Sequence, residues 1–559
     1  MSASRQAKMI PDQSLARWSW EYAQQVQQPE IERRNRSGIV IKPLYTPQDW
    51  DSCRYEADLG YPGQAPYARG IYPAMYRGRT WSRRMLVGLG TPEDFNLRQK
   101  EMLASGTTAV NFIPCNSVFR GYDIDEVDPL LIGTCGTAVN TLDDMRMALD
   151  GIDLGAVSLG MNDPSPFTLA AFVMLLAEEQ NTPWSGLTGT SNQADFISHY
   201  VANHMFYRLS LEGSRRVLLD HIRFMAAQAP GWNTLSIVGQ HMQQAGATPA
   251  QTLGFTLSSA LWYVDSCCRS GMNVDDFVHR FTFFFDSSIS LFEEVAKFRA
   301  GRRLWARLLR ERFGAKSPRS LRFKFHAQTS GVDLTQQQPI NNIARVALQA
   351  LAAVLGGAQS LHTDAYDEAL ATPSPETAII AIMTQNIIAE ETGVADVIDP
   401  LGGSYYLETL TNEMEQKALD VIESVDSRGG MFEAVRTGFV QAQIGESARQ
   451  FQEKVDSGEQ TVVGVNKYRL PEEEEADMPI YRPDQRAIAA QYERLARYKK
   501  ERSQATLRRG LDELARAAGD PARNVFGAVI EAIRSGATHG EVVGTLRTEL
   551  GFGSPYPGT

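Results

Sequence analysis

The stretch RFKFHAQ at residues 322–328, together with AQSLHT at residues 358–363, decides the fold. Both are strand-length runs, and the amphipathic segment ARVALQALAAVL (344–355) between them has the length of a helix. A short run, a helix and a second short run are typical of a βαβ unit with parallel strands. The stretch therefore predicts an α/β fold.

The same alternation extends outward, from about residue 107 to residue 400. Further helical patterns are FTLAAFVMLLAEEQ (167–180) and SLFEEVAKFRAGRRLWARLLRERF (290–313). Strands are expected at Ala109–Ile113, Ala156–Met161, Gly186–Thr190, Thr234–Gly239, Phe281–Phe285, Arg322–Gln328, Ala358–Thr363 and Ala395–Ile398. About eight strand–helix repeats in about 290 residues predict a TIM (β/α)8 barrel. A doubly wound sheet is the alternative, and it is disfavoured because no glycine-rich phosphate turn follows the first strand.

Three regions are expected along the chain. Residues 1–106 form an N-terminal arm, helical around Ser14–Gln27, and a substrate-entrance segment whose part Gly60–Gly90 is too irregular for a regular element. Residues 107–469 form the barrel with a helical cap, because the helical pattern continues after the last strand. Residues 470–559 start with the acidic linker PEEEEADMP (Pro471–Pro479) and continue as a C-terminal helical extension.

The composition excludes several classes of protein. A net charge of -11 argues against a nucleic-acid surface, which needs an excess of Lys and Arg. No apolar run approaches the roughly 20 residues of a membrane span, and the N-terminus lacks the apolar core of a signal peptide. The cysteines lack CxxC spacing, which suits a reducing compartment better than a disulfide framework: Cys53, Cys115, Cys135, Cys267 and Cys268. We therefore expect a cytoplasmic protein that binds neither nucleic acid nor a membrane.

Small or polar residues occupy alternate positions in several expected strands. Alternate residues of a strand share one face, and the inward face of an ordinary TIM barrel carries bulky branched residues. Burying so many unpaired hydroxyls and amides costs about 1–3 kcal/mol each, so the pattern favours an axis open to a hydrophilic ligand. The alternative is that these residues lie at solvated strand ends. They are Ser158, Gly160 and Asn162; Ser236 and Gln240; His326, Gln328 and Ser330; and Ser360, His362 and Asp364.

Three histidines lie where barrel chemistry gathers. His241, His326 and His362 each follow or end an expected strand, and active sites of TIM barrels lie at the C-terminal ends of the strands. The histidines lack HExxH and Cys/His zinc spacing, so no metal site is expected in this chain. No GxSxG, P-loop or nicotinamide-binding motif is present, which leaves hydrolase and kinase interpretations without support.

Several long motifs resemble the methylmalonyl-CoA mutase family, in order and spacing over almost the whole chain. They are RGIYPAMYRGRTW (69–81), GLGTPEDFN (88–96), RGYD (120–123), GQHMQQAGATP (239–249), LFEEVAKFRA (291–300), HAQTSG (326–331), GGAQSLHTDAYDEA (356–369), ADVIDPLGGSYYLE (395–408) and GVNKYR (464–469). The resemblance implies a barrel whose axis is threaded by coenzyme A, with adenosylcobalamin across the C-terminal mouth. A polar axis agrees with that arrangement.

The resemblance also implies roles for individual residues. His241 donates a hydrogen bond to the thioester oxygen, where negative charge develops as the carbonyl group migrates. Gln328 and Glu368 match positions that hold the adenosyl group, and Asp364 stands where the family usually has Asn. Positions that match contacts to the coenzyme A chain or its phosphates are Tyr72, Met75, Arg79, Ser82, Arg84, Ser158, Arg280 and Ser360.

The cobalamin-binding module of the family usually carries a DxHxxG motif, whose His ligates cobalt. This sequence has no DxHxxG. The resemblance is therefore to the large subunits of isobutyryl-CoA and 2-hydroxyisobutyryl-CoA mutases, and it implies a separate small cobalamin-binding subunit. A homodimer of large subunits within a heterotetramer is expected.

The acyl pocket is expected to include Leu86, Asn111, Ile113 and Gln240. The methylmalonyl enzyme reads its free carboxylate with a Tyr and an Arg; Leu86 falls at the Tyr, and the Arg position falls near Asn203–His204. Because a buried carboxylate without a cation is strongly unfavourable, a short branched or hydroxylated acyl group is expected instead. The hydroxyisobutyryl enzyme also has an aliphatic residue at position 86, but its hydroxyl-binding Asp is replaced here by Ile113.

Three other functions stay open from the sequence. The chain could be a catalytically silent acyl-CoA-binding partner of a cobalamin subunit, or methylmalonyl-CoA mutase proper. A coenzyme A lyase on the same barrel would need a metal or base constellation, and none is recognisable in the sequence.

Overall fold

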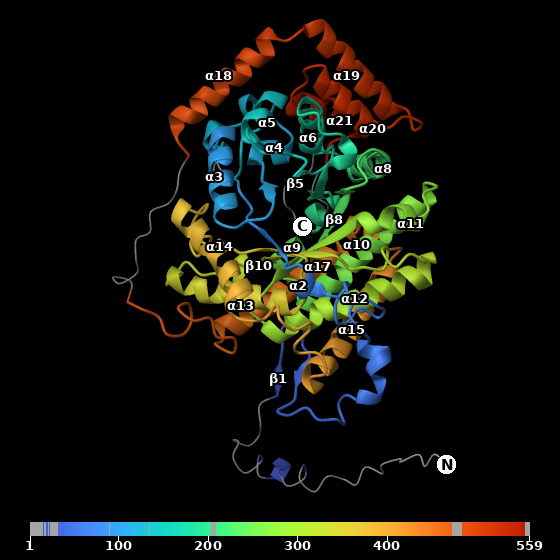
Figure 1. Ribbon diagram of the computed structural model, residues 1–559, viewed down its shortest axis with the longest axis vertical. Coiled ribbons are helices and arrows are strands. Elements are labelled where there is room, and N and C mark those ends of the chain that lie inside the picture. The colour runs from blue at the N-terminus through green and yellow to red at the C-terminus, as the bar shows by residue number, and fades with distance from the viewer. Residues whose placement is uncertain are drawn as a thin grey trace.

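The computed structural model describes residues 32–88, 90–133, 135–202, 208–471 and 483–553, together with Leu15, residues 18–20 and Tyr22. Most of the expected arm helix at Ser14–Gln27, nearly all of the acidic linker and the substrate position at Asn203–His204 lie outside these residues. Within the described part, helices surround a central set of strands (Figure 1). No described helix is both long enough and apolar enough to cross a bilayer.

The strands form two parallel sheets. The first has the order β3 (Ser82–Arg84), β11 (Ser360–His362), β10 (Phe325–Thr329), β9 (Phe281–Ser287) and β8 (Leu235–Val238). The second has the order β4 (Val110–Phe112), β5 (Ser158–Asn162), β6 (Thr188–Asn192) and β7 (Trp232–Asn233). A short antiparallel pair, β1 (Arg33–Arg34) and β2 (Val40–Ile41), lies apart from them.

The two sheets meet at both of their edges. Strands β7 and β8 are consecutive in the chain and are separated by Thr234 alone. At the other edge, Val87, just beyond β3, forms a parallel bridge with Phe112 of β4. The amide of Ile113 donates to the Val87 carbonyl oxygen over 3.1 Å. The carboxyl ends of the strands in both sheets therefore face the same region.

The sequence predicted seven of the nine strands of the two sheets but missed β3 and β7 and placed one strand wrongly. The run Ala395–Ile398 forms turns rather than a strand, with Asp399 at φ 50° beside it. Its place is taken by β3, from a segment in which no regular element was expected. Strand β3 reads Ser-Arg-Arg, and its side chains are half-buried, so it lacks the apolar pattern of a strand and is recognisable only by its pairing with β11.

In the two parallel sheets, a helix follows each strand except β7 before the next strand begins. These helices are α3 (Pro92–Ala104), α5 (Leu142–Ala148), α6 (Thr168–Glu179), α8 (Leu211–Gln228), α10 (Pro249–Arg269), α12 (Leu291–Phe313), α13 (Asn342–Leu355) and α14 (Pro375–Glu390). The family-like motifs explain where two of them start. Thr91 before α3 and Thr248 before α10 each form a capping box, with Pro at the first helical position.

The polar positions of neighbouring strands fall in register. Residues paired in a parallel ladder point to the same face of the sheet. Ser82 pairs with Ser360, and Ser360 pairs with His326. In the second sheet Asn111 pairs with Gly160, which pairs with Thr190. The hydrophilic strand face that the sequence predicts is present at these positions, whereas the first ladder continues to the apolar Phe284 of β9 and Val238 of β8.

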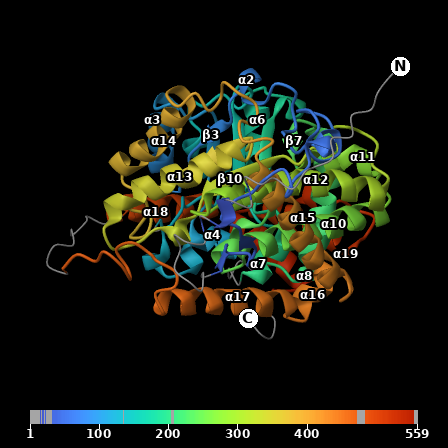
Figure 2. The same cartoon turned by 90° about the horizontal axis from the view of Figure 1, so that it is seen from below.

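The last part of the chain packs back onto the strand–helix core. Helix α15 (Tyr405–Asp426) lies against α10 and α12, and α16 (Met431–Arg436) and α17 (Phe439–Asp456) follow it (Figure 2). The final helices α18 (Gln485–Glu501), α19 (Gln504–Gly519), α20 (Val525–Arg534) and α21 (His539–Leu550) arch over one side of the molecule (Figure 1). Helix α20 packs against α6 and α8, so the extension shares the core of the main body.

Candidate functional site

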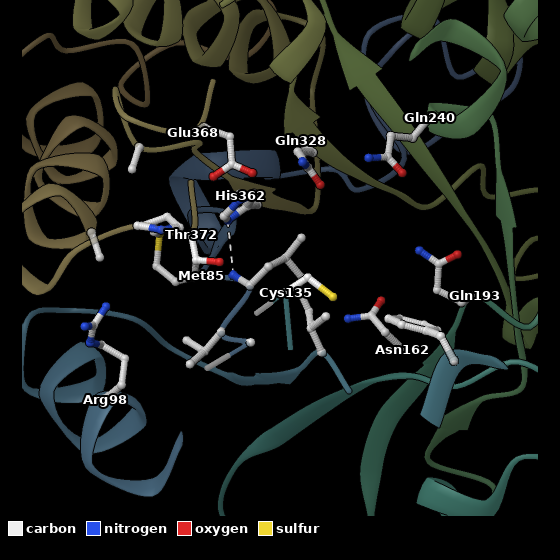
Figure 3. A pocket seen from close by; sticks show the side chains of 18 of the residues that line it. Met85, Arg98, Cys135, Asn162, Gln193, Gln240, Gln328, His362, Glu368 and Thr372 are labelled. Atoms are coloured by element: carbon white, nitrogen blue, oxygen red, sulfur yellow. Dashed lines mark hydrogen bonds between the residues drawn. The ribbon is translucent and has the colours of Figure 1, made fainter. Parts of the chain in front are cut away.

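A cavity of about 760 Å³ opens at the carboxyl ends of the strands (Figure 3). Side chains from both sheets converge on it, with Gln240, Gln328 and His362 on one side and Asn162 on the other. Its lining includes Leu86, Ile113, Gln240, His241, Gln328 and Glu368, which the sequence analysis assigned to the acyl pocket, the catalytic step and the adenosyl contacts. The sequence reasoning therefore identified residues that the fold brings together.

The remaining predicted residues do not line this cavity. Asn111 lies below it on β4, and Asp364 lies behind its wall. The residues predicted to contact coenzyme A also lie outside the lining: Tyr72, Met75, Arg79, Ser82, Arg84, Ser158, Arg280 and Ser360. Several of these precede the cavity residues on the same strands, so they lie toward the amino ends of the strands.

Polar side chains fill the space beneath the cavity. The two terminal nitrogens of Arg84 donate to Asn111 Oδ1 over 2.7 Å and to Ser158 Oγ over 2.8 Å, which joins β3 to β4 and β5. Burial, and then Arg79, lower the pKa of Arg84 to about 10. Gly160 is required here, because a Cβ would come within 2.0 Å of Asn111 Oδ1. The interior is hydrophilic rather than packed with aliphatic residues.

A group of cations lies at the amino ends of β9 and β10. The Lys324 ammonium is buried beside Arg280, Arg322 and Arg319, and burial together with these cations lowers its pKa to about 7. The Arg322 guanidinium lies 5.2 Å from the centroid of the Tyr72 ring. A site that crowds positive charge in this way favours an anionic ligand. The sequence analysis found Arg280 and Tyr72 but missed Lys324 and Arg322.

A serine in the segment after β6 contacts the ring of His241. His241 lies in α9 (Gln240–Gln244), directly after β8, and its Nδ1 is 3.1 Å from Ser198 Oγ. The Ser198 hydroxyl donates to the backbone oxygen of Asp195 over 2.9 Å. Because that hydroxyl has one hydrogen, both contacts are hydrogen bonds only when His241 Nδ1 carries the ring proton. In the neutral ring Nε2 is then the unprotonated nitrogen.

Helix α12 fixes the short helix that carries His241. The Lys297 ammonium donates to Gln243 Oε1 over 2.9 Å and to the backbone oxygen of Asp286 over 2.8 Å. Gln243 Nε2 donates to Glu294 Oε1 over 2.9 Å, and Glu294 also forms an ion pair with Lys297. Lys297 and Glu294 are fully buried. The family-like motif LFEEVAKF thus supplies the support for α9.

Three carboxyl groups gather at one end of the cavity, where Asp364 and Asp367 are buried and Glu368 is exposed at the surface of the cavity. Glu368 lies in its wall, and burial followed by the charges of Asp364 and Asp367 raises its pKa to about 8. The raised pKa favours the protonated form of Glu368, which can donate a hydrogen bond from its hydroxyl. Gln328 donates from Nε2 to Asp364 Oδ1 over 3.1 Å, which leaves its buried Oε1 without a protein partner. The wall at this end offers both a donor and an acceptor.

Carboxamides line the cavity on the side of the second sheet. Asn162 Nδ2 donates to the Phe112 backbone oxygen over 2.9 Å, so the buried Asn162 Oδ1 must point elsewhere and has no protein partner. Asn116 and Gln193 also line the cavity, each with a partnerless amide oxygen. Sequence reasoning placed Asn162 on the polar strand face but missed Asn116, the first residue of the short helix after β4, and Gln193, in the turn after β6.

Comparisons with known proteins agree with this arrangement. The family description "Methylmalonyl-CoA mutase" matches residues 34–552. The chain belongs to the methylmalonyl-CoA mutase family. The chain is therefore an enzyme of the isomerase class, an intramolecular transferase.

Individual relatives of the mutase family match over nearly the full chain. The 2-hydroxyisobutanoyl-CoA mutase large subunit of Aquincola tertiaricarbonis is 41% identical over 91% of this chain and 90% of its own length. The methylmalonyl-CoA mutase of Rhizobium meliloti is also 41% identical, over 93% of this chain and 72% of its own length. The mitochondrial methylmalonyl-CoA mutase of Homo sapiens is 38% identical over 92% of this chain and 68% of its own length.

The names of these relatives specify acyl groups of different charge, because a methylmalonyl group carries a free carboxylate and a 2-hydroxyisobutanoyl group does not. Cationic side chains in the cavity of this mutase therefore bear on which acyl group it accepts. Among the described residues, the cationic side chains in the lining are Arg98 and Arg120. Arg98 lies across the cavity from Gln240 (Figure 3), and it is bonded to Glu101 and to the Ser374 backbone oxygen. Neither arginine was anticipated from the sequence. Residues 203–207 lie outside the described part of the chain.

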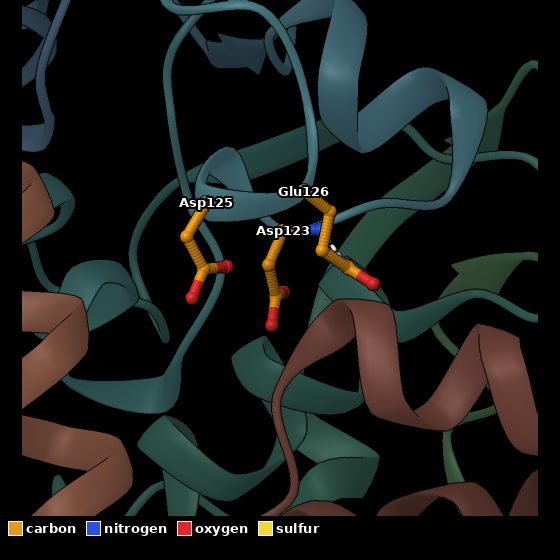
Figure 4. Close-up of side chains that lie close together, drawn as sticks. All are labelled: Asp123, Asp125 and Glu126. Atoms are coloured by element: carbon orange, nitrogen blue, oxygen red, sulfur yellow. Dashed lines mark hydrogen bonds between the residues drawn. The ribbon is translucent and has the colours of Figure 1, made fainter.

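One acidic cluster in the described part of this mutase has the geometry to hold a metal ion. Asp123, Asp125 and Glu126 converge in the loop after α4 (Asn116–Arg120), away from the cavity (Figure 4). The Lys499 ammonium of α18 forms ion pairs of 3.0 Å with Asp123 and 2.9 Å with Asp125. The Asp123 carboxylate also accepts from Thr538 and Gly540. The cluster therefore anchors the C-terminal extension.

Proposed function

We propose that this chain is the large, substrate-binding subunit of an adenosylcobalamin-dependent acyl-CoA mutase that acts on a short branched or hydroxylated acyl group without a free carboxylate. The reaction is the radical 1,2-migration of the thioester carbonyl group. The observation that carries the proposal is one cavity whose lining brings together His241, Leu86, Ile113, Gln328 and Glu368.

We further propose that the two sheets form one (β/α)8 barrel. Eight strand positions follow each other around the axis when β7 and β8 are counted as one broken strand. The Val87–Phe112 bridge and the adjacency of β7 to β8 support this arrangement. Hydrogen bonds from Arg84 to Asn111 and Ser158 support it from the inside.

The polar axis suits an acyl-CoA that enters from the amino ends of the strands. The cations Arg280, Arg322 and Lys324 would meet the phosphates, since phosphate binding needs clustered positive charge. The hydroxyl and imidazole groups of Ser360 and His326, 2.8 Å apart, would face the pantetheine amides. The thioester would then reach the cavity beside His241. Arg79, Ser82 and Met75 would complete this route near its entrance.

Gln328 and Glu368 in the cavity wall fit a cofactor that carries a ribose. The buried Gln328 Oε1 lacks a protein partner, and the raised pKa of Glu368 favours its protonated form, so the wall would offer an acceptor and a donor to vicinal hydroxyls. Adenosylcobalamin, when bound, would supply the radical that starts and ends the reaction. Its cobalt ligand would come from a separate small subunit, in a heterotetramer built on two large subunits.

His241 would act on the thioester oxygen. Its Nδ1 proton is committed to Ser198, so Nε2 donates a hydrogen bond only when the ring is an imidazolium. A donor placed where negative charge develops lowers the barrier without tightening substrate binding equally. The apolar Leu86 and Ile113 beside it would exclude water from the radical.

The lining supports a neutral acyl group. Leu86 and Ile113 are apolar, and the polar groups nearby are the carboxamides of Asn116, Asn162 and Gln193, which suit a hydroxyl donor better than a carboxylate. A buried carboxylate would need a desolvated cation. Arg98 and Arg120 keep methylmalonyl-CoA as the second candidate, since both line the same cavity.

Reconstitution tests the proposal. The chain is combined with a cognate cobalamin-binding subunit and adenosylcobalamin, and isomerisation of isobutyryl-CoA, 2-hydroxyisobutyryl-CoA and methylmalonyl-CoA is followed by chromatography. Turnover of a neutral acyl group at least tenfold above methylmalonyl-CoA is expected. Preference for methylmalonyl-CoA would favour the second candidate, and acyl-CoA binding without any rearrangement would identify a silent binding partner.

A further inference from the structure

One buried carboxylate behind the cavity wall contacts two side chains that line the cavity. Asp364 is 2% exposed and does not line the cavity itself. Its Oδ1 is 3.1 Å from His362 Nε2 and 3.1 Å from Gln328 Nε2. We propose that Asp364 is a positioning residue that fixes Leu86 through His362 and fixes the Gln328 amide directly. The inference rests on the proposed function only for its kinetic consequence.

The ring of His362 connects Asp364 to the acyl end of the cavity. The Leu86 amide donates to His362 Nδ1 over 3.1 Å, the contact drawn in Figure 3. A nitrogen that accepts this bond carries no proton, so in the neutral ring Nε2 carries it, 3.1 Å from Asp364 Oδ1. The chain Leu86–His362–Asp364 therefore sets one tautomer of His362. It also holds the backbone of Leu86, which β3 alone does not reach.

The same carboxylate decides which atom Gln328 presents. A carboxylate only accepts hydrogen bonds, so the Gln328 NH2 group must face Asp364 and the carbonyl oxygen must face away. With a neutral amide at position 364, either end of Gln328 could find a partner. The orientation of Gln328 toward a ligand would then no longer be fixed.

Asp364 is itself held rigidly between two strands. Thr329 of β10 donates from Oγ1 to Asp364 Oδ2 over 3.0 Å and accepts from the Asp364 amide over 2.7 Å. Together with His362 and Gln328, three side-chain donors surround the buried carboxylate. The nearby Asp367 is similarly buried but bonds to Ser374 and Thr377 instead, and contacts neither His362 nor Gln328 in the described hydrogen bonds. It offers a matched control.

The test compares Asp364→Asn with Asp367→Asn in the full-length chain. ¹⁵N-histidine-labelled protein gives the His362 tautomer by NMR, with the signal assigned from a His362→Gln sample. Calorimetry gives the Kd of isobutyryl-CoA, and the reconstituted enzyme gives kcat and KM. Wild type should show the Nε2–H tautomer. Asp364→Asn should populate both tautomers, weaken isobutyryl-CoA about three- to tenfold and lower kcat about tenfold, whereas Asp367→Asn should leave the tautomer and Kd unchanged.

Two results would overturn the inference. The first is an Nδ1–H tautomer of His362 in the wild-type protein, which needs no variant and therefore decides the matter even if Asp364→Asn fails to fold. The second is Asp364→Asn with the wild-type tautomer, Kd and kcat. The tautomer is measured without cofactor or small subunit, so a wild-type protein without mutase turnover would contradict the proposed function and leave this inference standing.

Discussion

His241 is the side chain on which the proposed chemistry depends most directly, because its imidazole lines the cavity together with Leu86 and Ile113 and contacts Ser198. His241→Ala should lower kcat by on the order of 10²–10³-fold, as for a lost oxyanion donor, with little change in acyl-CoA affinity. Steady-state kinetics of the reconstituted enzyme measure both. His279→Gln, far from the cavity lining, is the control, and unchanged turnover in His241→Ala would remove this residue from the mechanism.

Glu368 makes the stability of the protein depend on pH. Its pKa rises from 4.5 in the unfolded chain to about 8 in the fold, so between these values the native state binds the extra proton. The contribution of Glu368 to the free energy of unfolding is fully present below about pH 4.5, and it is lost as the pH rises toward 8.

Glu368→Gln keeps the shape of the protonated group and cannot ionise. Its Tm should therefore match wild type near pH 5 and exceed it at pH 8.5 by only about a degree or two, because the side chain is exposed and solvent screens its charge. Calorimetric scans across this range measure the difference. Glu376→Gln, a residue exposed at the start of α14, should show no such trend, and a constant Tm difference for Glu368→Gln would argue against the raised pKa.

At the scale of elements, α9 depends on a buried ion pair of α12. Lys297→Met leaves Glu294 as an uncompensated buried charge and should lower the free energy of unfolding by about 3–5 kcal/mol. The double variant Lys297→Met/Glu294→Gln should recover much of that loss, because no charge is then left without a partner. Denaturant unfolding distinguishes the two. If the double variant is as unstable as the single one, packing rather than charge dominates at this position.

The strands and helices themselves show why local patterns succeed or fail. Strand β10 alternates buried apolar Phe325 and Ala327 with the polar His326 and Gln328, and this period of two is visible in the sequence. Strand β3 lacks that pattern, because Arg84 is an inward residue whose charge is satisfied by Asn111 and Ser158 from other strands. A local rule cannot recognise a strand whose partners are distant in sequence.

For the whole molecule, the C-terminal extension behaves as part of the core. Phe526 of α20 is fully buried against His221 and Phe224 of α8, with ring centroids 4.5 and 5.3 Å apart. Phe526→Ala should destabilise the entire protein by about 3–5 kcal/mol and lower its single thermal transition. Phe552→Ala, at an exposed position, should change Tm by less than a degree or two. A separate low-temperature transition in the Phe526→Ala scan would show instead that the extension unfolds independently.

The sequence by itself determined the repeating strand–helix pattern, the hydrophilic strand face and the family, and through the family it indicated His241, Gln328 and Glu368. These features are local: alternate residues share a strand face, and motifs keep their spacing. Only the tertiary structure decided that Ser82–Arg84 completes the first sheet, that Asn116 and Gln193 reach the cavity, and that Asp364 stands behind its wall. Those outcomes depend on which loops meet at the carboxyl ends of strands far apart in sequence, where long-range packing rather than local periodicity sets the position of each side chain.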